Sequence, residues 1–220
     1  MTIKHPAKYS GVLLPHLKEL LKGKTIVLDC FGGTGRLKEI CSTATILEIE
    51  PEWAELSGAL VGDATNMDKD WTGKFQAVCT SPCYGNRMAD SFNAKDTSKR
   101  NTYHHVLGRK PTLGSSAVMQ WGNKYKGFHI KAWEEVFRVL EYGGIFILNI
   151  SDHIRKGEVV KVSEWHKDTI LKLGFALVEH RKIKTPRNKY GANRQRVEFE
   201  SIYVFEKLQN CNKDNQKVKR

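Results

Sequence analysis

Short apolar runs alternate with segments of helical periodicity along most of this 220-residue chain. Five such runs are separated by turns or amphipathic stretches, and two more follow one another near the C-terminus. The seven predicted strands cover residues 25–30, 43–50, 59–64, 74–80, 143–151, 175–183 and 198–208. Strands that alternate with helices predict an α/β three-layer sandwich with a mostly parallel sheet, in which the last two strands form a hairpin-like pair.

Apolar residues at helical spacing predict the helices that separate these strands. The predicted helices cover 12–22, 51–58, 128–140 and 158–173, and a further helix is expected directly after Gly35. Segment 85–127 interrupts the alternation, because it is polar and has little periodicity; a connection of this length is usually functional or disordered. We expect a single domain over 1–206 with 85–127 as an insertion, followed by a disordered basic tail at 207–220.

The chain is strongly basic, with 36 Lys and Arg against 24 Asp and Glu and a formal charge of +12. A soluble chain of this charge is expected to meet a polyanion, and nucleic acid is the first candidate. The five cysteines contain no C-x-x-C pair, so zinc-ribbon spacing is absent. Scattered thiols, together with the lack of a long apolar span or a signal-peptide core, predict a cytoplasmic protein without a membrane partner.

Acidic residues lie at the ends of three successive predicted strands: Asp29, Glu48 and Asp63. Ligands of parallel sheets bind beyond the carboxyl ends of the strands, where such residues meet. The turn "DCFGGTG" after the first strand is rich in glycine, which lets backbone approach a ligand closely, but it is neither G-x-G-x-x-G nor a P-loop. Glu48 is placed to accept from a ribose diol and Asp63 from an adenine amino group. Acids at such junctions also cap helices, which is the structural alternative for each residue taken singly.

This order of motifs resembles the class I S-adenosylmethionine-dependent methyltransferases, whose glycine-rich first motif is similar to "DCFGGTG". The resemblance implies a Rossmann-like fold and S-adenosylmethionine as cofactor. The N-terminal "HPAKYS" is similar to the segment that packs beside the cofactor in amino-methylating DNA enzymes, although a plain N-terminal arm is an alternative. The cofactor-binding residues that the resemblance implies are Lys8, Tyr9, Asp29, Phe31, Gly32, Gly33, Thr34, Gly35, Glu48, Asp63 and Ala64.

The sequence "TSPCYG" follows the fourth predicted strand. It resembles the motif of methyltransferases that act on exocyclic nitrogens, in which Ser, Asn or Asp precedes Pro-Pro and an aromatic residue. Such an amine is a poor nucleophile, because its lone pair is delocalised into the ring. The Ser81 hydroxyl and the Pro82 carbonyl are candidate acceptors for its N–H bonds, and Tyr84 is a candidate to stack on the base. We therefore expect Ser81, Pro82 and Tyr84 to be catalytic.

Cys83 stands where that motif has its second proline. The replacement could loosen the loop, or Cys83 could be a nucleophile like that of the cytosine-C5 enzymes. Tyr84 completes the amino-methylating pattern and no Glu-Asn-Val element follows, so nitrogen methylation is favoured. Serine in the first position favours cytosine N4 over adenine N6. The resemblance thus points to DNA modification enzymes of phage or orphan bacterial type, which take the base out of the stack or act on single strands.

Two basic segments are candidates for reading nucleic acid, the insertion 85–127 and the loop 184–196. The insertion interleaves Tyr103, Trp121 and Tyr125 with basic residues, which suits base stacking and phosphate contact, although solvated loop charges are the alternative. The pair His104–His105 lacks a third ligand at useful spacing, so no metal is predicted. The predicted nucleic-acid-binding residues are Arg87, Lys99, Arg100, Arg109, Arg187, Asn193 and Arg194.

Several alternatives to a DNA amino-methyltransferase stay open. An RNA base methyltransferase would use the same chemistry, but such enzymes usually carry an added RNA-binding domain. A catalytically dead copy of the fold that binds nucleic acid as a scaffold is a third reading, which Cys83 favours and the three acids disfavour. A protein-glutamine methyltransferase is disfavoured by the charge of +12. Monomer and homodimer are both compatible with the chain.

Overall fold

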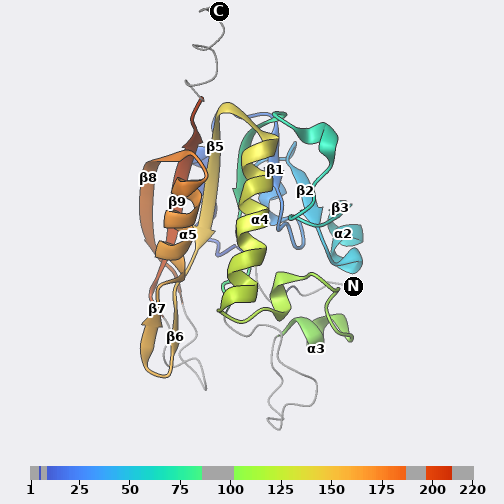
Figure 1. Ribbon diagram of the computed structural model, residues 1–220. Coiled ribbons are helices and arrows are strands. Elements are labelled where there is room, and N and C mark those ends of the chain that lie inside the picture. The colour runs from blue at the N-terminus through green and yellow to red at the C-terminus, as the bar shows by residue number, and fades with distance from the viewer. Residues whose placement is uncertain (1–4, 6–8, 86–101, 187–196, 210–220) are drawn as a thin grey trace, which may run out of the picture.

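The computed structural model describes residues 5, 9–85, 102–186 and 197–209, and its centre is a seven-stranded sheet (Figure 1). The strand order is β3-β2-β1-β4-β5-β9-β8, with β1 to β5 parallel and β9 antiparallel to both β5 and β8. The strands are β1 (Val27–Asp29), β2 (Thr45–Glu48), β3 (Leu60–Val61), β4 (Phe75–Thr80), β5 (Leu140–Ile150), β8 (Phe175–Lys184) and β9 (Phe199–Lys207). All seven predicted strands are present, and the final antiparallel pair is confirmed.

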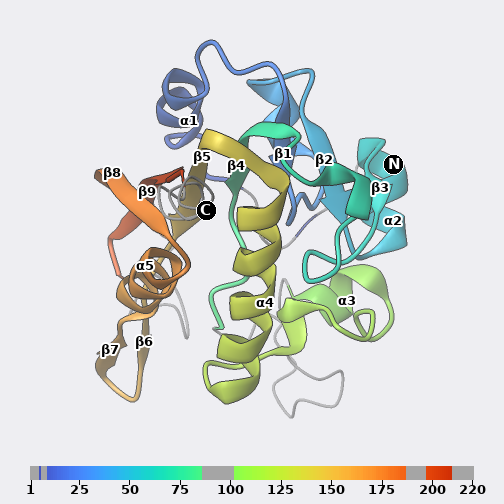
Figure 2. The same cartoon turned by 45° about the horizontal axis from the view of Figure 1, so that its top comes forward.

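Helices cover both faces of this sheet (Figures 1 and 2). Alternate strand residues point to opposite faces, so Leu28 and Val78 pack under α4 and α5, whereas Val27 and Ala77 pack against α1. Both faces are apolar, as buried parallel strands require. The helices are α1 (Leu14–Leu20), α2 (Pro51–Ser57), α3 (Tyr103–Leu107), α4 (Asn123–Val139) and α5 (Val162–Lys172), with short 3-10 turns η1 (Arg36–Glu39), η2 (Lys69–Trp71) and η3 (Ser116–Val118). Among the described helices none is long and apolar enough to cross a membrane.

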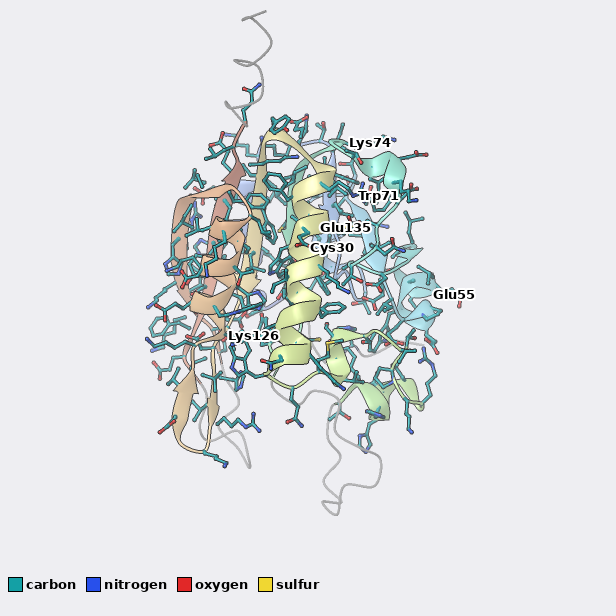
Figure 3. The ribbon with its side chains drawn as sticks, viewed as in Figure 1. Cys30, Glu55, Trp71, Lys74, Lys126 and Glu135 are labelled. Atoms are coloured by element: carbon teal, nitrogen blue, oxygen red, sulfur yellow. The ribbon has the colours of Figure 1, made fainter. Side chains whose placement is uncertain are left out.

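Helix α4 is fixed to the sheet by its buried face and by a polar contact at its side. Trp133 and Val136 are fully buried against the strands. Glu135 accepts from the backbone N–H of Met67 at 2.7 Å, and Arg138 donates to the carbonyl oxygen of Met67 at 3.1 Å. Figure 3 shows Glu135 along α4 and Lys126 near its N-terminal end. The helix therefore lies in one orientation over the β1–β4 junction, with its first turns at the carboxyl edge of the sheet.

The order of strands reverses between β1 and β4, so the loops after these two strands leave in opposite directions. Figure 1 shows that α3 and the hairpin β6 (His153–Arg155) with β7 (Glu158–Val160) lie at the lower end of the sheet, where β5 ends. Helix α3 of the predicted insertion and the hairpin β6–β7 therefore both lie at the carboxyl edge of the sheet.

Two local predictions were wrong. The helix expected after Gly35 is only the 3-10 turn η1, because the chain must return to β2 within a few residues, so a long helix dipole is absent there. The helix expected over 158–173 begins at Val162, and the hairpin β6–β7 precedes it. Lys156 and Gly157 both have positive φ, as a two-residue hairpin turn requires.

The structure describes the insertion and the tail only in part. Within 85–127, residues 102–127 form α3, η3 and the first turn of α4, so this part is folded onto the domain. Strand β9 continues through Lys207, whose ammonium donates to the Leu140 carbonyl oxygen at 2.6 Å. Residues 86–101 and 210–220 lie outside the described residues.

Two glycine-to-alanine changes should have opposite effects on stability. A Cβ at Gly32 would lie 2.0 Å from Cγ2 of Ile46, so Gly32→Ala should lower the free energy of unfolding by about 1–3 kcal/mol through overpacking. A Cβ at Gly127, on α4, meets nothing within 4 Å, so Gly127→Ala should raise it by about 0.5–1 kcal/mol. Urea unfolding of both variants tests this; equal effects would contradict the close approach of the glycine-rich turn to β2.

Candidate active site at the carboxyl edge of the sheet

Asp29, at the end of β1, is bound to the end of the neighbouring strand β4. The Thr80 hydroxyl donates to Asp29 Oδ1 at 2.6 Å, and the Phe31 N–H donates to the same oxygen at 3.2 Å. The Tyr9 hydroxyl lies 3.4 Å from Asp29 Oδ2 and 3.5 Å from the Cys79 carbonyl oxygen. Burial raises the pKa of Asp29 to about 6, against the opposing effect of these hydrogen bonds. A buried carboxylate that is ionised at neutral pH therefore lies where the strand order reverses, between β1 and β4, and Tyr9 lies beside it.

Glu48, at the end of β2, holds the glycine-rich turn. Its Oε2 accepts from the Gly33 N–H at 2.7 Å, and its Oε1 accepts from the Glu50 N–H at 2.9 Å. Burial raises the pKa of Glu48 to about 7. Because each carboxylate oxygen can accept two hydrogen bonds, each keeps a lone pair beyond these backbone contacts.

The glycines of the turn are needed for packing. Gly33 has φ +54° and a Cβ there would lie 3.0 Å from Nε2 of His5, while Gly35 has φ +70° and faces Ser57 at 2.9 Å. A hollow of about 700 Å³ opens beside the turn, lined by Thr34, Gly35, Arg36, Lys38 and Glu39. Glu48 and Asp63 are absent from this lining, so the hollow marks the outer side of the turn rather than the space between the acids.

Asp63 follows β3 and is half-buried. Its Oδ1 accepts from the Thr65 N–H at 2.8 Å and from the Thr65 hydroxyl at 2.9 Å, while Oδ2 faces Gly114. The neighbouring Ala64 is buried in the core under α4. Phe31 is half-buried and stacks on His129 with ring centroids 5.9 Å apart. One oxygen of the Asp63 carboxylate thus lies in a local turn. The other is directed to residues 102–118, which we call the covering segment of this edge.

Glu50 attaches that covering segment to the site. This fully buried carboxylate accepts from the Thr112 hydroxyl at 2.8 Å, from the Thr112 N–H and from the Arg109 guanidinium at 2.9 Å. Arg109 also pairs with Glu52. A buried carboxylate without partners would be costly, which gives Arg109 a structural role. Arg109 was predicted to bind nucleic acid; in the structure its donors are used inside the chain.

Two of the aromatic residues predicted to stack on bases are inside the protein. Tyr125 is fully buried and Tyr103 is 6% exposed, so the prediction was wrong for both. Trp121 is half-buried, lies 5.7 Å from Trp165 between ring centroids, and carries the Lys126 ammonium 4.9 Å above its ring. The folded part of the insertion therefore supports the site from within.

The loop after β4 brings Ser81 and Tyr84 together with two residues that the sequence did not single out. The Tyr84 hydroxyl donates to Glu200 Oε2 at 3.1 Å and lies 2.9 Å from the Ser81 hydroxyl. Asn149 donates to Tyr84 at 3.1 Å and to Glu200 at 2.7 Å. Because the single Tyr84 proton is directed to Glu200, the Ser81 hydroxyl must donate to Tyr84. The Ser81 oxygen therefore keeps its lone pairs for another donor, and Pro82 beside it is buried.

Thr80, Asn149 and Glu200 contact the site residues but were not predicted from the sequence. Asn149 interrupts the apolar run 143–151, which is a signal that could have been used. Glu200 comes from β9, 116 residues after Tyr84, and nothing local indicates it. The remaining predicted site residues, Lys8, Arg87, Lys99, Arg100, Arg187, Asn193 and Arg194, lie outside the described residues, so their roles stay predictions.

The comparisons identify the fold. No protein-family model and no curated protein sequence matches the chain. Among solved structures, the cyclase SpnF has a TM-score of 0.57 at 12% identity, covering 89% of this chain and 80% of SpnF. The N-methyltransferase NodS from Bradyrhizobium japonicum has a TM-score of 0.54 at 11% identity, covering 89% of this chain and 93% of NodS.

A third solved structure, an S-adenosylmethionine-dependent methyltransferase from Methanosarcina mazei, has a TM-score of 0.54 at 12% identity and covers 88% of this chain and 97% of its own. The expected Rossmann-like methyltransferase fold is therefore confirmed. One of these three proteins is a cyclase by name, so the fold by itself does not identify the reaction.

The Glu50–Arg109 contact should control how firmly the covering segment is held. Arg109→Gln removes a charged partner of a buried carboxylate, and local opening of residues 102–118 should become easier by about 1–3 kcal/mol. Hydrogen-exchange mass spectrometry measures this as faster exchange of that segment. Lys161→Gln, which breaks an exposed ion pair with Glu164, is the matched control and should change exchange by little. Unchanged exchange in Arg109→Gln would show that the segment is held by other contacts.

Proposed function

We propose that this protein transfers the methyl group of S-adenosylmethionine to an exocyclic amine of a DNA base, with cytosine N4 as the preferred atom. The observation that carries the proposal is the polarised chain from Ser81 through Tyr84 to Glu200, at the switch point of a methyltransferase fold. This series of hydrogen bonds leaves the Ser81 oxygen with free lone pairs, because the Ser81 proton is donated to Tyr84. Such an oxygen can accept a hydrogen bond from an amine N–H.

The acids at the strand ends suit the proposed cofactor. Glu48 has a lone pair on each oxygen for a ribose diol, and Asp63 Oδ2, which is turned away from the Thr65 contacts, would accept from an amino group. Asp29 would supply negative charge near a cation. Bound S-adenosylmethionine would supply an electrophilic methyl group on a positively charged sulfur; its carbon–sulfur bond would break as the nitrogen–carbon bond forms, and a neutral thioether would leave.

Ser81 would act on the amine by accepting one N–H bond, while the Pro82 carbonyl accepts the other. These bonds pull the nitrogen toward tetrahedral geometry and release its lone pair from the ring. As the nitrogen loses a proton, that proton passes to Ser81, the Ser81 proton passes to Tyr84, and the Tyr84 proton passes to Glu200. Each oxygen gives up one proton as it gains one, so only Glu200 ends protonated.

Tyr84 would have a second role as the surface on which the base stacks. Three polar contacts fix its hydroxyl, so the orientation of its ring is set before the substrate arrives. A planar base that enters beside Ser81 would then meet an aromatic ring already in place.

DNA is the proposed substrate because the charge of +12 suits a polyanion and because serine leads the acceptor motif. The target base would have to leave the stack to reach a loop at this depth, unless the strand is single. RNA and an inactive nucleic-acid-binding scaffold are the outcomes against which the proposal is tested. Methyl transfer from labelled S-adenosylmethionine to DNA and to RNA, with mass spectrometry of the nucleosides, should yield N4-methylcytosine from DNA. Finding 5-methylcytosine, methylation of RNA alone, or no methylation despite cofactor binding would overturn it.

Loss of either end of the polarised chain should affect chemistry and leave cofactor binding intact. Ser81→Ala and Glu200→Gln should each lower kcat by about 10²–10⁴, the usual range for a lost proton-transfer group. Calorimetry should show unchanged affinity for S-adenosylmethionine in both variants. Glu198→Gln is the matched control, since Glu198 is exposed and pairs with Lys184. Asp63→Ala should show the reverse pattern, with weakened cofactor binding.

Cofactor affinity should depend on pH through Glu48. Its pKa is raised to about 7 in the free protein, and a ribose diol would favour the ionised form. Binding should therefore weaken as pH falls below about 7, by up to about tenfold per pH unit and with release of a proton on binding, and it should level off above pH 7, where Glu48 is already ionised. Calorimetry in buffers of different ionisation enthalpy measures that proton. Glu48→Gln should bind more weakly and lose this pH dependence; a flat profile in the unmodified protein would remove Glu48 from the cofactor site.

A further inference from the structure

Cys83 stands at the second proline of the acceptor motif, and both its thiol and its carbonyl oxygen are bound. Its thiol lies 3.3 Å from the Tyr103 hydroxyl, and its carbonyl oxygen accepts from the Tyr125 hydroxyl at 2.8 Å. The two tyrosines come from α3 and from the first turn of α4, so they reach the loop from separate elements. Neither Tyr103 nor Tyr125 belongs to the hydrogen-bonded series Ser81–Tyr84–Glu200.

Tyr125 is directed to the Cys83 carbonyl by a buried relay. Trp133 Nε1–H donates to His166 Nδ1 at 3.0 Å, which makes that nitrogen an acceptor and places the ring proton on Nε2. His166 Nε2–H then donates to the Tyr125 oxygen at 2.8 Å, so the Tyr125 proton is left for Cys83. Burial lowers the pKa of His166 well below its usual value, so the ring stays neutral and the direction of the relay does not change.

Tyr103 is held by packing. It is buried and meets Trp53 of α2 edge-to-face, with ring centroids 5.1 Å apart. Cys83 itself packs against this cluster. The thiol therefore meets a tyrosine whose position is set by α2, the helix that follows the Glu48 strand.

We propose that Tyr103 and Tyr125, which we call the tyrosine pair, do the work of the missing proline by holding the acceptor loop in its catalytic geometry. A proline ring would fix φ of residue 83 covalently. The tyrosine pair instead fixes the side chain of Cys83 and the peptide plane that leads to Tyr84. Among the described residues the Cys83 N–H donates to no backbone acceptor, so a proline at this position would remove no such bond. Both tyrosines are positioning residues, and their effect on catalysis rests on the proposed function.

A rescue experiment tests this role. Tyr103→Phe should lower kcat about five- to tenfold, the equivalent of one hydrogen bond, with KM nearly unchanged. In a Cys83→Pro background the ring already restrains the loop, so adding Tyr103→Phe should change kcat less than about twofold. Tyr203→Phe is the matched control, because Tyr203 is equally buried but packs on His180, away from the loop. The same loss from Tyr103→Phe in both backgrounds would overturn the proposal.

Hydrogen-exchange mass spectrometry of a peptide covering 79–85 separates this proposal from the proposed function. Tyr103→Phe and Tyr125→Phe should each speed exchange of the loop amides, and Tyr203→Phe should not. Faster exchange in a protein that methylates no nucleic acid would uphold the tyrosine pair and reject the function. Unchanged exchange in both variants would reject the tyrosine pair, whatever the activity. Tyr103→Phe carries the test if Tyr125→Phe, which also removes the partner of His166, fails to fold.

Discussion

The parallel pairing of β1 with β4 is the contact on which the rest of the site depends. It aligns Leu28 with Val78, and one step further along it brings the Thr80 hydroxyl to 2.6 Å from Asp29. The chain between these two residues builds β2, β3 and the two remaining acids, all of which end at the same edge. Since the order of strands reverses here, the glycine-rich turn and the acceptor loop leave on either side of one gap. A cofactor at one loop and a substrate at the other would then face each other without any further device.

Among the described residues, four carboxylates are buried at this edge. Their hydrogen-bond partners distinguish the one that holds the fold together from those that are candidates for binding or reaction. Glu50 pairs with Arg109 and accepts a hydrogen bond from Thr112, so it anchors the covering segment. Asp29 and Glu48 accept from neutral donors alone within the described part of the chain, and burial raises their pKa values to about 6 and about 7. Glu200 ends a chain of hydroxyl groups. Burying Asp29 and Glu48 beside neutral donors is costly, and such carboxylates are typical of sites that bind or react.

The loop after β4 departs from the expected motif at one position. Its first, second and fourth residues match the expected pattern, and Cys83 does not. The structure surrounds Cys83 with two tyrosines from the segment that had been expected to stack on bases. Tyr103 and Tyr125 therefore contact the loop after β4 from inside the protein, which agrees with their burial.

The sequence by itself determined the seven strands, the antiparallel end of the sheet, and the acids at three strand ends, because these features depend on local periodicity and on spacing along one chain. It did not determine the hairpin β6–β7, whose signal is a two-residue turn with few apolar residues around it. Only the tertiary structure decided that Arg109 pairs with Glu50, that Tyr125 meets Cys83, and that Glu200 meets Tyr84. Each of these contacts joins residues 42 to 116 positions apart, and which of several similar side chains is buried, and against which partner, is set by packing and by the cost of leaving a buried polar group unpaired.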